Sequence, residues 1–295
     1  MAAPVPGNAN EFIESQLDTR LRDIEEFFKA DGLSFSGPIL FGVENLLRNI
    51  IEPKKAGSDR TKLIVILTTT GGYIEIVRRI VDTIRHHYDT VEFIIPNYAY
   101  SAGTVLALSG DAIQMDYYSQ LGPIDPQLEI TKGRMVPALG YLEQYNRLIK
   151  KAQRGNISSA EVQLLISGFD QAELYQYEQA RNLSISLLKE WLVKYKFKNW
   201  EKTETRKITV TARRRTKRAE DIARLLNNTE KWHVHGCGIS MEVLRKDLNL
   251  KIDDFKENPD LDKKIRNYYD LLDDYMIKKG DRGVLHTVGT YRPYK

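Results

Sequence analysis

Apolar positions in the first half of the chain alternate between the spacing of strands and the spacing of helices. The runs "KLIVILTTTGG" at 62–72, "TVEFIIPN" at 90–97 and "AIQMD" at 112–116 predict buried strands. The segments 73–88 and 101–111 lie between these runs and carry apolar residues at helical spacing. Strand, helix, strand, helix and strand in this order predict right-handed crossovers in a parallel sheet, so we expect the α/β fold class.

Further helices are expected before and after this strand-helix pattern in the chain. Apolar residues recur at helical spacing from 12 to 28, and 38–51 reads as a short strand that leads into a helix. The second half is expected to hold long amphipathic helices at 138–155 and 169–197, a polar connector at 199–217, helices at 219–228, 241–250 and 263–280, and a final tail.

The change of character near Pro137 suggests how the chain is divided. We predict an N-terminal helix at 1–34, a core at 35–136, a helical region with a histidine-bearing loop at 137–255, and a C-terminal helix and tail at 256–295.

Composition narrows the class of protein. The 295 residues are 42% hydrophobic and 28% charged, with a net charge of +4, which is an ordinary globular balance. The basic run at 212–218 has no interleaved aromatic residues, so we expect a solvated loop or the start of a helix and no nucleic-acid partner. One cysteine, Cys237, excludes an intrachain disulfide and fits a reducing compartment. We expect no signal peptide, no membrane span and no cofactor, and therefore a cytoplasmic protein.

The stretch "NYAYSAGTVLALSGD" at 97–111 places a hydroxyl where a strand turns into a helix. Ser101 has two interpretations: an N-cap of the helix, or a nucleophile. The backbone N–H of Ala102, at the start of the helix, could stabilise an oxyanion, and the N–H of Gly72 could supply a second donor. Parallel sheets place chemistry at the carboxyl ends of their strands, and both the glycine pair and Ser101 fall there.

Further candidate groups lie in two loops. Asp125, in "LGPIDPQ", is either a carboxylate that orients an imidazole or part of an Asp-Pro turn. His233 and His235 flank Val234 and face the same side of an extended segment. An ordinary carboxylate has a pKa near 4 and is a poor base for serine, so a histidine is needed. No partner at zinc spacing accompanies these histidines, so we predict no metal site.

Other groups remain as alternatives. Lys150 and Lys151 could act as the base in a Ser–Lys dyad, although lysines on an amphipathic helix are usually solvated. Cys237 is a minor candidate for the nucleophile. We interpret His86 and His87 as surface residues at a helix end, and His286 belongs to the tail.

The motifs "ILTTTGG", "YAYSAGTVLALSGDAIQMD" and "LGPIDPQ", in this order, resemble the Clp-protease/crotonase superfamily. They are most similar to the serine dehydrogenase proteinase family, which is related to the Clp proteolytic subunit and to signal peptide peptidase A. The later segments "RAEDIARLLNNTEKWHVHGCGIS" and "LRKDLNLKI" are also similar to that branch, so the resemblance covers roughly 35–255. It implies a Clp/crotonase-like stacked ββα spiral core with a helical C-terminal extension, and a cytosolic serine endopeptidase.

The resemblance also implies a triad in the chain order Ser, Asp, His. Carried over by position, Ser101 is the nucleophile, Asp125 the orienting acid and His235 the general base, with the N–H groups of Gly72 and Ala102 as oxyanion donors. Clp subunits instead have their histidine about two dozen residues after the serine, where this chain has the aspartate. The chain also has "TTTGG" where relatives often have a proline before the glycines.

The resemblance further implies a peptide or protein substrate, a homo-oligomer and a regulatory partner chain. Two other functions stay open. A crotonase-type acyl-CoA enzyme would use the same glycine turn for a thioester enolate and would not need Ser101. A catalytically silent scaffold would use the long helices for assembly alone.

Overall fold

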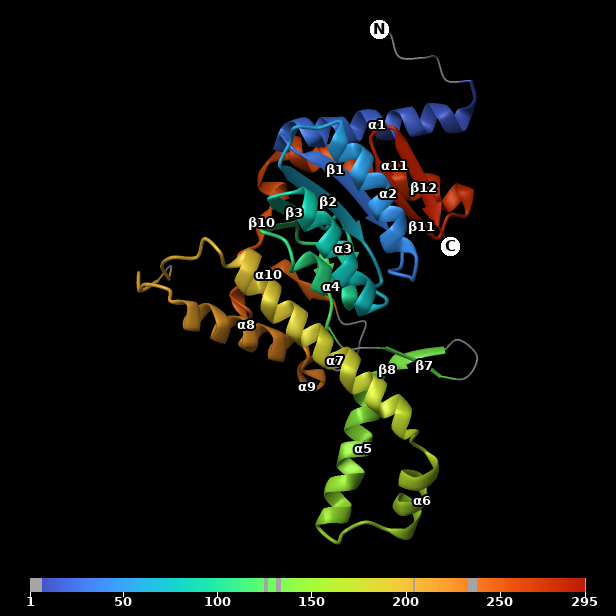
Figure 1. Cartoon of the computed structure of the whole chain (residues 1–295), viewed down its shortest axis with the longest axis vertical. Helices are drawn as coiled ribbons and strands as arrows, with labels where there is room; N and C mark the ends of the chain where they lie inside the picture. Colours follow the sequence, from blue (N-terminus) through green and yellow to red (C-terminus); the bar gives the residue numbers. More distant parts are fainter. Residues whose placement is uncertain (1–6, 125–126, 131–133, 204, 233–237, 295) are drawn as a thin grey trace.

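A seven-stranded sheet forms the centre of the computed structural model, which describes residues 7–124, 127–130, 134–203, 205–232 and 238–294 (Figure 1). The strands lie in the order β10-β5-β3-β2-β1-β11-β12. The first five run parallel to one another, and β11 and β12 are antiparallel. Their bounds are β1 (Asp31–Ser36), β2 (Lys62–Thr68), β3 (Thr90–Ile94), β5 (Ala112–Met115), β10 (Asp253–Asp254), β11 (Gly283–Thr287) and β12 (Thr290–Tyr294).

Both faces of the sheet are buried, which explains why the strands read as unbroken apolar runs. On β2, the side chains of Leu63, Val65 and Leu67 join one apolar cluster, and those of Ile64 and Ile66 join another. The first cluster packs under α2 (Val43–Ala56), α3 (Ile74–His87), α4 (Ala102–Ala107) and α7 (Gln171–Trp191). The second packs under α1 (Ala9–Phe28) and α11 (Pro259–Lys279).

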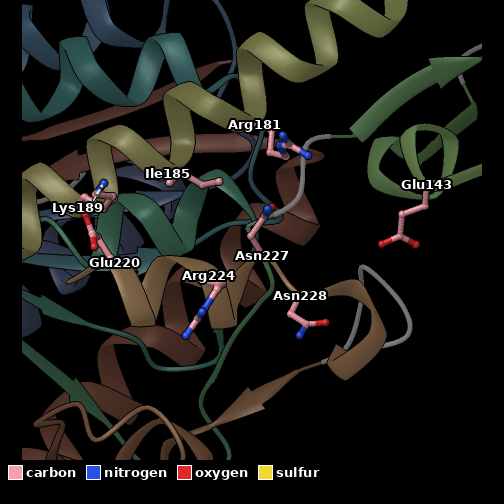
Figure 2. A pocket seen from close by; sticks show the side chains of 8 residues that line it. All are labelled: Glu143, Arg181, Ile185, Lys189, Glu220, Arg224, Asn227 and Asn228. Carbon is pink, nitrogen blue, oxygen red and sulfur yellow. Dashed lines mark ion pairs between the residues drawn. The ribbon is translucent and has the colours of Figure 1, made fainter. Parts of the chain in front are cut away.

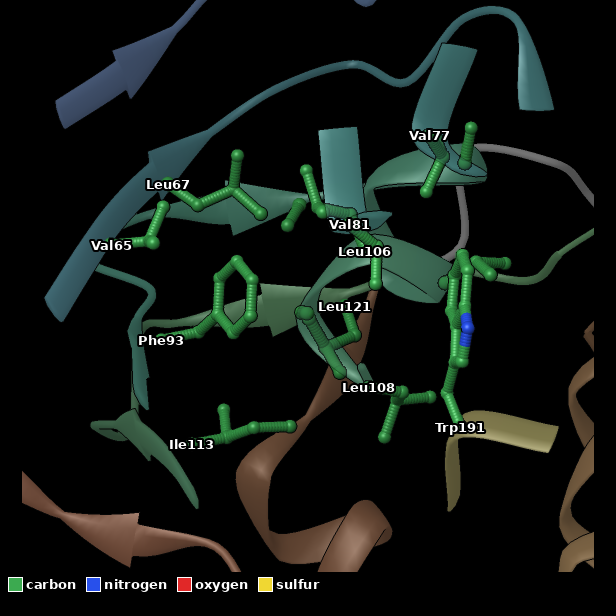
Figure 3. Close-up of a cluster of buried hydrophobic side chains, with 14 of the residues drawn as sticks. Val65, Leu67, Val77, Val81, Phe93, Leu106, Leu108, Ile113, Leu121 and Trp191 are labelled. Carbon is green, nitrogen blue, oxygen red and sulfur yellow. The ribbon is translucent and has the colours of Figure 1, made fainter. Parts of the chain in front are cut away.

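Figure 3 shows part of the first cluster. Phe93 of β3 lies among aliphatic side chains from α3 and α4, and Trp191 packs against them from the end of α7. The second half of α7, from Ala180 to Trp191, is therefore held against the sheet layer, while its first turns extend outward (Figure 1). The α/β class is confirmed.

An arm projects from this body between β6 and α7 (Figure 1). It consists of the hairpin β7 (Gln127–Ile130) and β8 (Arg134–Pro137), the helix α5 (Ala138–Gln153) and the short helix α6 (Ser159–Ser167). Ser158 and Glu161 form a capping box at the start of α6, and Asp170 caps α7. The capping residues therefore fix where the chain turns back toward the sheet.

After α7 a single π-helical turn (Leu192–Lys196) leads to α8 (Ala212–Leu226), α9 (Thr229–Trp232) and α10 (Met241–Lys246). Thr211 caps α8, so the basic run at 212–218 forms the first turns of a helix. The helix therefore begins inside the segment 199–217 that is expected to be a polar connector. A second small sheet joins β4 (Tyr98–Ala99), β6 (Gln120–Leu121) and β9 (Ile239–Ser240) in the order β4-β6-β9.

Two sequence predictions are wrong for the part of the main sheet that contains β1, β11 and β12. The first strand is β1 at 31–36 and not the segment that begins at Pro38, where Ile39 forms only a single bridge to Gly72. The expected tail after residue 280 is the hairpin β11–β12, which pairs with β1 in the register Ser34 to His286.

The predicted four-segment division remains a prediction. Within the described ranges, no helix is both long enough and apolar enough to cross a bilayer.

Candidate active site

The turn after β2 is built from glycines that approach other backbone segments closely. Gly71 and Gly72 have φ values of 97° and 147°, which side chains rarely allow. A Cβ on Gly72 would lie 2.1 Å from the carbonyl oxygen of Ile39. A Cβ on Gly71 would lie 2.8 Å from the Cβ of Ser101 and 3.3 Å from the amide nitrogen of Ala102. The glycine pair therefore lets the β2 turn lie directly against the serine turn.

Ser101 stands at the start of α4 with a φ of 53°, a left-handed conformation that is unusual for serine. Its side chain does not accept a capping hydrogen bond from α4, and it is 8% exposed. The N-cap interpretation of this hydroxyl is therefore wrong. A strained turn that places a serine between a strand and a helix is the arrangement by which a nucleophile elbow presents its hydroxyl.

The backbone around this serine leaves donors available. Among the described residues, neither the N–H of Gly72 nor the N–H of Ala102 donates a hydrogen bond. The turn itself is held by other amides: Tyr100 donates to the carbonyl of Thr69 at 2.9 Å, and Gly71 donates to the Thr69 hydroxyl at 3.0 Å. Two unpaired N–H groups beside one hydroxyl are what an oxyanion requires.

A cavity of about 350 Å³ lies over this corner. Gly72, Ser101 and Ala102 line one side of it, together with Tyr73 at the start of α3. The other wall comes from α7, whose contributing residues include Tyr175, Gln176, Tyr177, Gln179, Ala180 and Ser184. The serine turn therefore faces a partly open cavity that is large enough for a side chain and part of a peptide backbone.

The three-stranded sheet β4-β6-β9 brings together the segments that carry the predicted triad. Strand β4 ends two residues before Ser101, and β6 ends four residues before Asp125. Strand β9 begins four residues after His235 and pairs with β6, with Leu121 opposite Ile239. Asp125, His233, His235 and Cys237 lie outside the described residues, so their assignments remain predictions.

Several polar and packing contacts hold these segments in register. The Thr104 hydroxyl lies 2.8 Å from the carbonyl oxygen of Ala99 and 2.9 Å from both the carbonyl oxygen and the amide nitrogen of Gly122. The amide of Ile124 donates to the carbonyl of Leu226, at the end of α8. The start of α4, the segment before Asp125 and the end of α8 are thus tied to one another.

The side chain of Gln120, in β6, contacts both the serine segment and the residue before β9. The Tyr100 hydroxyl donates to the side-chain oxygen of Gln120 at 2.7 Å. A Cβ on Gly238 would lie 2.0 Å from that oxygen, so a larger residue there would displace the Gln120 side chain from its place beside Tyr100. The chain that follows the predicted histidine loop is therefore packed closely against the strand that precedes the predicted aspartate.

The two lysines proposed as alternative bases lie elsewhere. Lys150 and Lys151 are in the last turn of α5, which Figure 1 shows at the outer end of the arm. Lys151 donates to Glu161 of α6 at 2.5 Å, and neither lysine lines the cavity at Ser101. The structure does not bring them to the serine turn.

The remaining histidines are also separate from this corner. His86 and His87 end α3 and stack edge to face at a centroid distance of 4.8 Å. His286 is buried in β11, where its Nδ1 lies 2.7 Å from the Tyr268 hydroxyl and its Nε2 lies 3.2 Å from Asp18. Among the described residues, no group of three His, Cys, Asp or Glu side chains could hold a metal ion.

Sequence reasoning missed the wall that α7 contributes. The apolar periodicity of this helix indicates only which side is buried, and the polar residues Gln176 and Gln179 read as solvent-facing. The sequence shows Gly71 as one of a pair, but its contact with the serine turn depends on two strands lying side by side. Neither feature has a local sequence signal.

Comparisons with known proteins agree with the architecture. A sequence model of the family described as ClpP-like SDH-type serine proteinases matches residues 41–209. An uncharacterized protein of Methanocaldococcus jannaschii is 31% identical over 177 residues, which are 56% of this chain and 54% of that protein. A second uncharacterized protein of this organism is 36% identical over 85 residues, which are 29% of this chain and 28% of the relative. The chain spans about half the length, or less, of these relatives.

Two solved structures are also similar. A mutant of the 1510-N membrane-bound stomatin-specific protease, in complex with a substrate peptide, is 16% identical, with 88% of this chain and 84% of that chain covered and a TM-score of 0.46. The ClpP protease catalytic domain from Plasmodium falciparum is 15% identical, with 34% of this chain and 59% of that chain covered and a TM-score of 0.29. The family match confirms the resemblance that the motifs indicate.

Proposed function

The chain belongs to the family of ClpP-like SDH-type serine proteinases, and we propose that it hydrolyses peptide bonds through an acyl-enzyme on Ser101. One observation carries the proposal. Ser101 has a left-handed backbone and no capping role, and it shares a cavity with the unpaired N–H groups of Gly72 and Ala102.

In the proposed reaction, the Ser101 oxygen attacks the carbonyl carbon of the scissile bond and its proton passes to the imidazole of His235. The carbonyl oxygen becomes an oxyanion that accepts hydrogen bonds from the N–H groups of Gly72 and Ala102. The imidazolium returns the proton to the leaving amine as the C–N bond breaks. Water then attacks the ester by the reverse sequence and releases the acid product and the serine.

The assignment of Asp125 and His235 to this triad is supported by chain length and pairing. An extended chain of four residues reaches at most about 14 Å, so neither residue can lie far from the ends of β6 and β9. Both strands belong to the small sheet that β4 enters immediately before Ser101. We keep His235 as the proposed base, with His233 as the alternative from the same loop.

Labelling with a fluorophosphonate probe tests the proposal. We expect the wild-type protein to be labelled at Ser101, and the Ser101→Ala variant to lose both the label and any peptidase activity. Ser109→Ala is the matched control, because Ser109 is also a buried serine, and its hydroxyl donates to the carbonyl of Leu106 at 2.6 Å. Equal labelling of the wild-type protein and Ser101→Ala would contradict the proposed nucleophile.

The same experiment separates the two other functions. A crotonase-type enzyme would turn over an acyl-CoA thioester and would keep that activity in Ser101→Ala. A silent scaffold would show neither labelling nor turnover.

His235→Ala and Asp125→Ala are expected to abolish or strongly slow labelling, and His233→Ala is expected to spare it. Loss of labelling in His233→Ala alone would move the role of base to that residue.

We also propose a homo-oligomer that acts on a peptide or protein substrate, with a regulatory partner chain, in a reducing compartment such as the cytoplasm. The single cysteine supports the compartment, and the long helices α5 and α7 support assembly. Light scattering tests the oligomer, and a monomer at micromolar concentration would contradict it.

A further inference from the structure

A second cavity, of about 570 Å³, lies between α5, α7 and α8 (Figure 2). Its wall carries charged and amide side chains together with one apolar side chain, that of Ile185. The polar residues that matter here are Glu143 of α5, Arg181 and Lys189 of α7, and Glu220, Arg224 and Asn227 at α8. Charged and amide groups gathered in a cavity of this size suit a ligand that is recognised by hydrogen bonds and charge.

The charges on this wall are unequally paired. Lys189 lies 3.1 Å from Glu220, and Arg224 lies 3.1 Å from Asp221. Within the described ranges, Arg181 has neither an ion pair nor a hydrogen bond, and its Nε is buried without a partner. A buried Nε–H without an acceptor is unfavourable, so an anionic oxygen in the cavity would be stabilised beside this guanidinium.

A complementary acceptor lies on the facing helix. The Oδ1 atom of Asn227, which follows the last turn of α8, is buried and has no donor within the described part of the chain. The helices α7 and α8 pack against each other, and Figure 2 shows Arg181 and Asn227 on the two sides of the same cavity. The wall therefore offers an unpaired cationic donor and an unpaired neutral acceptor to one ligand.

We propose that this cavity binds the C-terminal carboxylate of a peptide. A terminal carboxylate would accept hydrogen bonds from the Arg181 guanidinium, and a backbone N–H of the same peptide would donate to Asn227 Oδ1. Glu143 lies on the opposite wall, on α5, so a carboxylate is favoured on the α7–α8 side. The inference rests on the proposed peptidase function, because it assigns a substrate or product terminus to this enzyme.

The two cavities share structural elements. Ala180 and Ser184 line the cavity at Ser101, and their neighbours in sequence, Arg181 and Ile185, line the second one. Asn227 directly follows Leu226, whose carbonyl accepts from Ile124 in the first cavity. A peptide terminus held at Arg181 is thus bound by the helix that forms the wall over the nucleophile.

Binding is measured on the Ser101→Ala protein, so that the result does not depend on catalysis. Fluorescence anisotropy compares two peptides of the same sequence, labelled at the N-terminus, which end in a free acid or in an amide. We expect the acid to bind at least tenfold more tightly, the effect of one charge-assisted hydrogen-bond pair. Adding Arg181→Gln is expected to remove this difference, and Arg181→Lys to restore part of it.

Arg48→Gln is the matched control, because it removes one positive charge from an exposed site on α2 and is expected to leave the preference unchanged. Equal binding of acid and amide, or a preference that survives Arg181→Gln, would overturn the proposal. Inorganic phosphate that binds through Arg181 without competition from either peptide would mean a small-anion site instead. Failure of fluorophosphonate labelling would count against the peptidase mechanism and not against this binding result.

Discussion

Thr104, three residues after Ser101, connects the helix of the proposed nucleophile with the segment that leads to Asp125. Its hydroxyl is fully buried and lies within 2.9 Å of Ala99 and of two backbone groups of Gly122. A hydroxyl has one proton and two lone pairs, so it can donate to a carbonyl while it accepts from the Gly122 N–H. It therefore sets the spacing between the two segments.

Thr104→Val replaces this hydroxyl with a methyl group of similar shape. The buried N–H of Gly122 then loses its acceptor, which costs about 1–3 kcal/mol. With a urea dependence of about 2–3 kcal/mol per M, the unfolding midpoint falls by about 0.3–1.5 M. Because a displacement of about 1 Å near a reacting group costs on the order of a hundredfold, we expect fluorophosphonate labelling of Ser101 to slow by about tenfold to a hundredfold.

Thr104→Ser is the control that separates the hydroxyl from the packing. It keeps the hydrogen bonds and loses one methyl group, which costs about 1 kcal/mol. We expect its labelling rate to stay close to that of the wild-type protein. Urea unfolding followed by circular dichroism, together with the labelling rate, measures both effects. If Thr104→Val is labelled as fast as Thr104→Ser and unfolds at the same urea concentration or above it, the hydroxyl does not hold these segments.

Three further outcomes are expected. Gly72→Ala places a Cβ 2.1 Å from a backbone carbonyl oxygen and should lower turnover by about a hundredfold to a thousandfold, whereas Gly140→Ala, in open space on α5, should not. Arg266→Gln removes the donor to the buried Asp116 carboxylate and should lower the free energy of unfolding by about 3 kcal/mol, measured in urea. Burial raises the pKa of Tyr268 above its usual value near 10, so the stability it contributes is complete below pH 10 and is lost as the pH rises further. Tyrosinate absorbance should therefore follow unfolding at alkaline pH, and full ionisation of the folded protein near pH 10 would contradict this.

The elements that the sequence predicts correctly are those whose burial is local in the chain. Strand β2 is apolar on both faces, and α3 carries Ile74, Val77, Ile80, Val81 and Ile84 on one buried side. A period of two or of 3.6 residues is visible without knowledge of what packs against it. The α/β class and the position of the serine turn follow from this pattern.

Strand β1 and its pairing with β11 could not be predicted in the same way. Strand β1 has two large apolar residues, Leu33 and Phe35, on one face. Its other face carries the small residues Gly32 and Ser34, so the apolar pattern is too short to indicate a buried strand. A Cβ on Gly32 would lie 2.9 Å from Leu21 of α1, so the small residue reflects the close approach of that helix. One of the two partners of β1 is β11, about 250 residues later, and no local pattern indicates such a pairing.

The proposed catalytic arrangement is equally hard to predict from the sequence, since each strand of the small sheet contains two residues. Two residues are too few for a periodic signal and too few for independent stability, so β4, β6 and β9 form only because their flanks are already packed. Those flanks are the α4 turn, the Thr104–Gly122 contact and the close packing of Gly238 on Gln120. Motifs can therefore name a serine, an aspartate and a histidine, but their convergence depends on tertiary contacts between segments about 20 and 120 residues apart. A change that loosens these contacts would leave the parallel sheet folded and would separate the groups that the proposed chemistry needs.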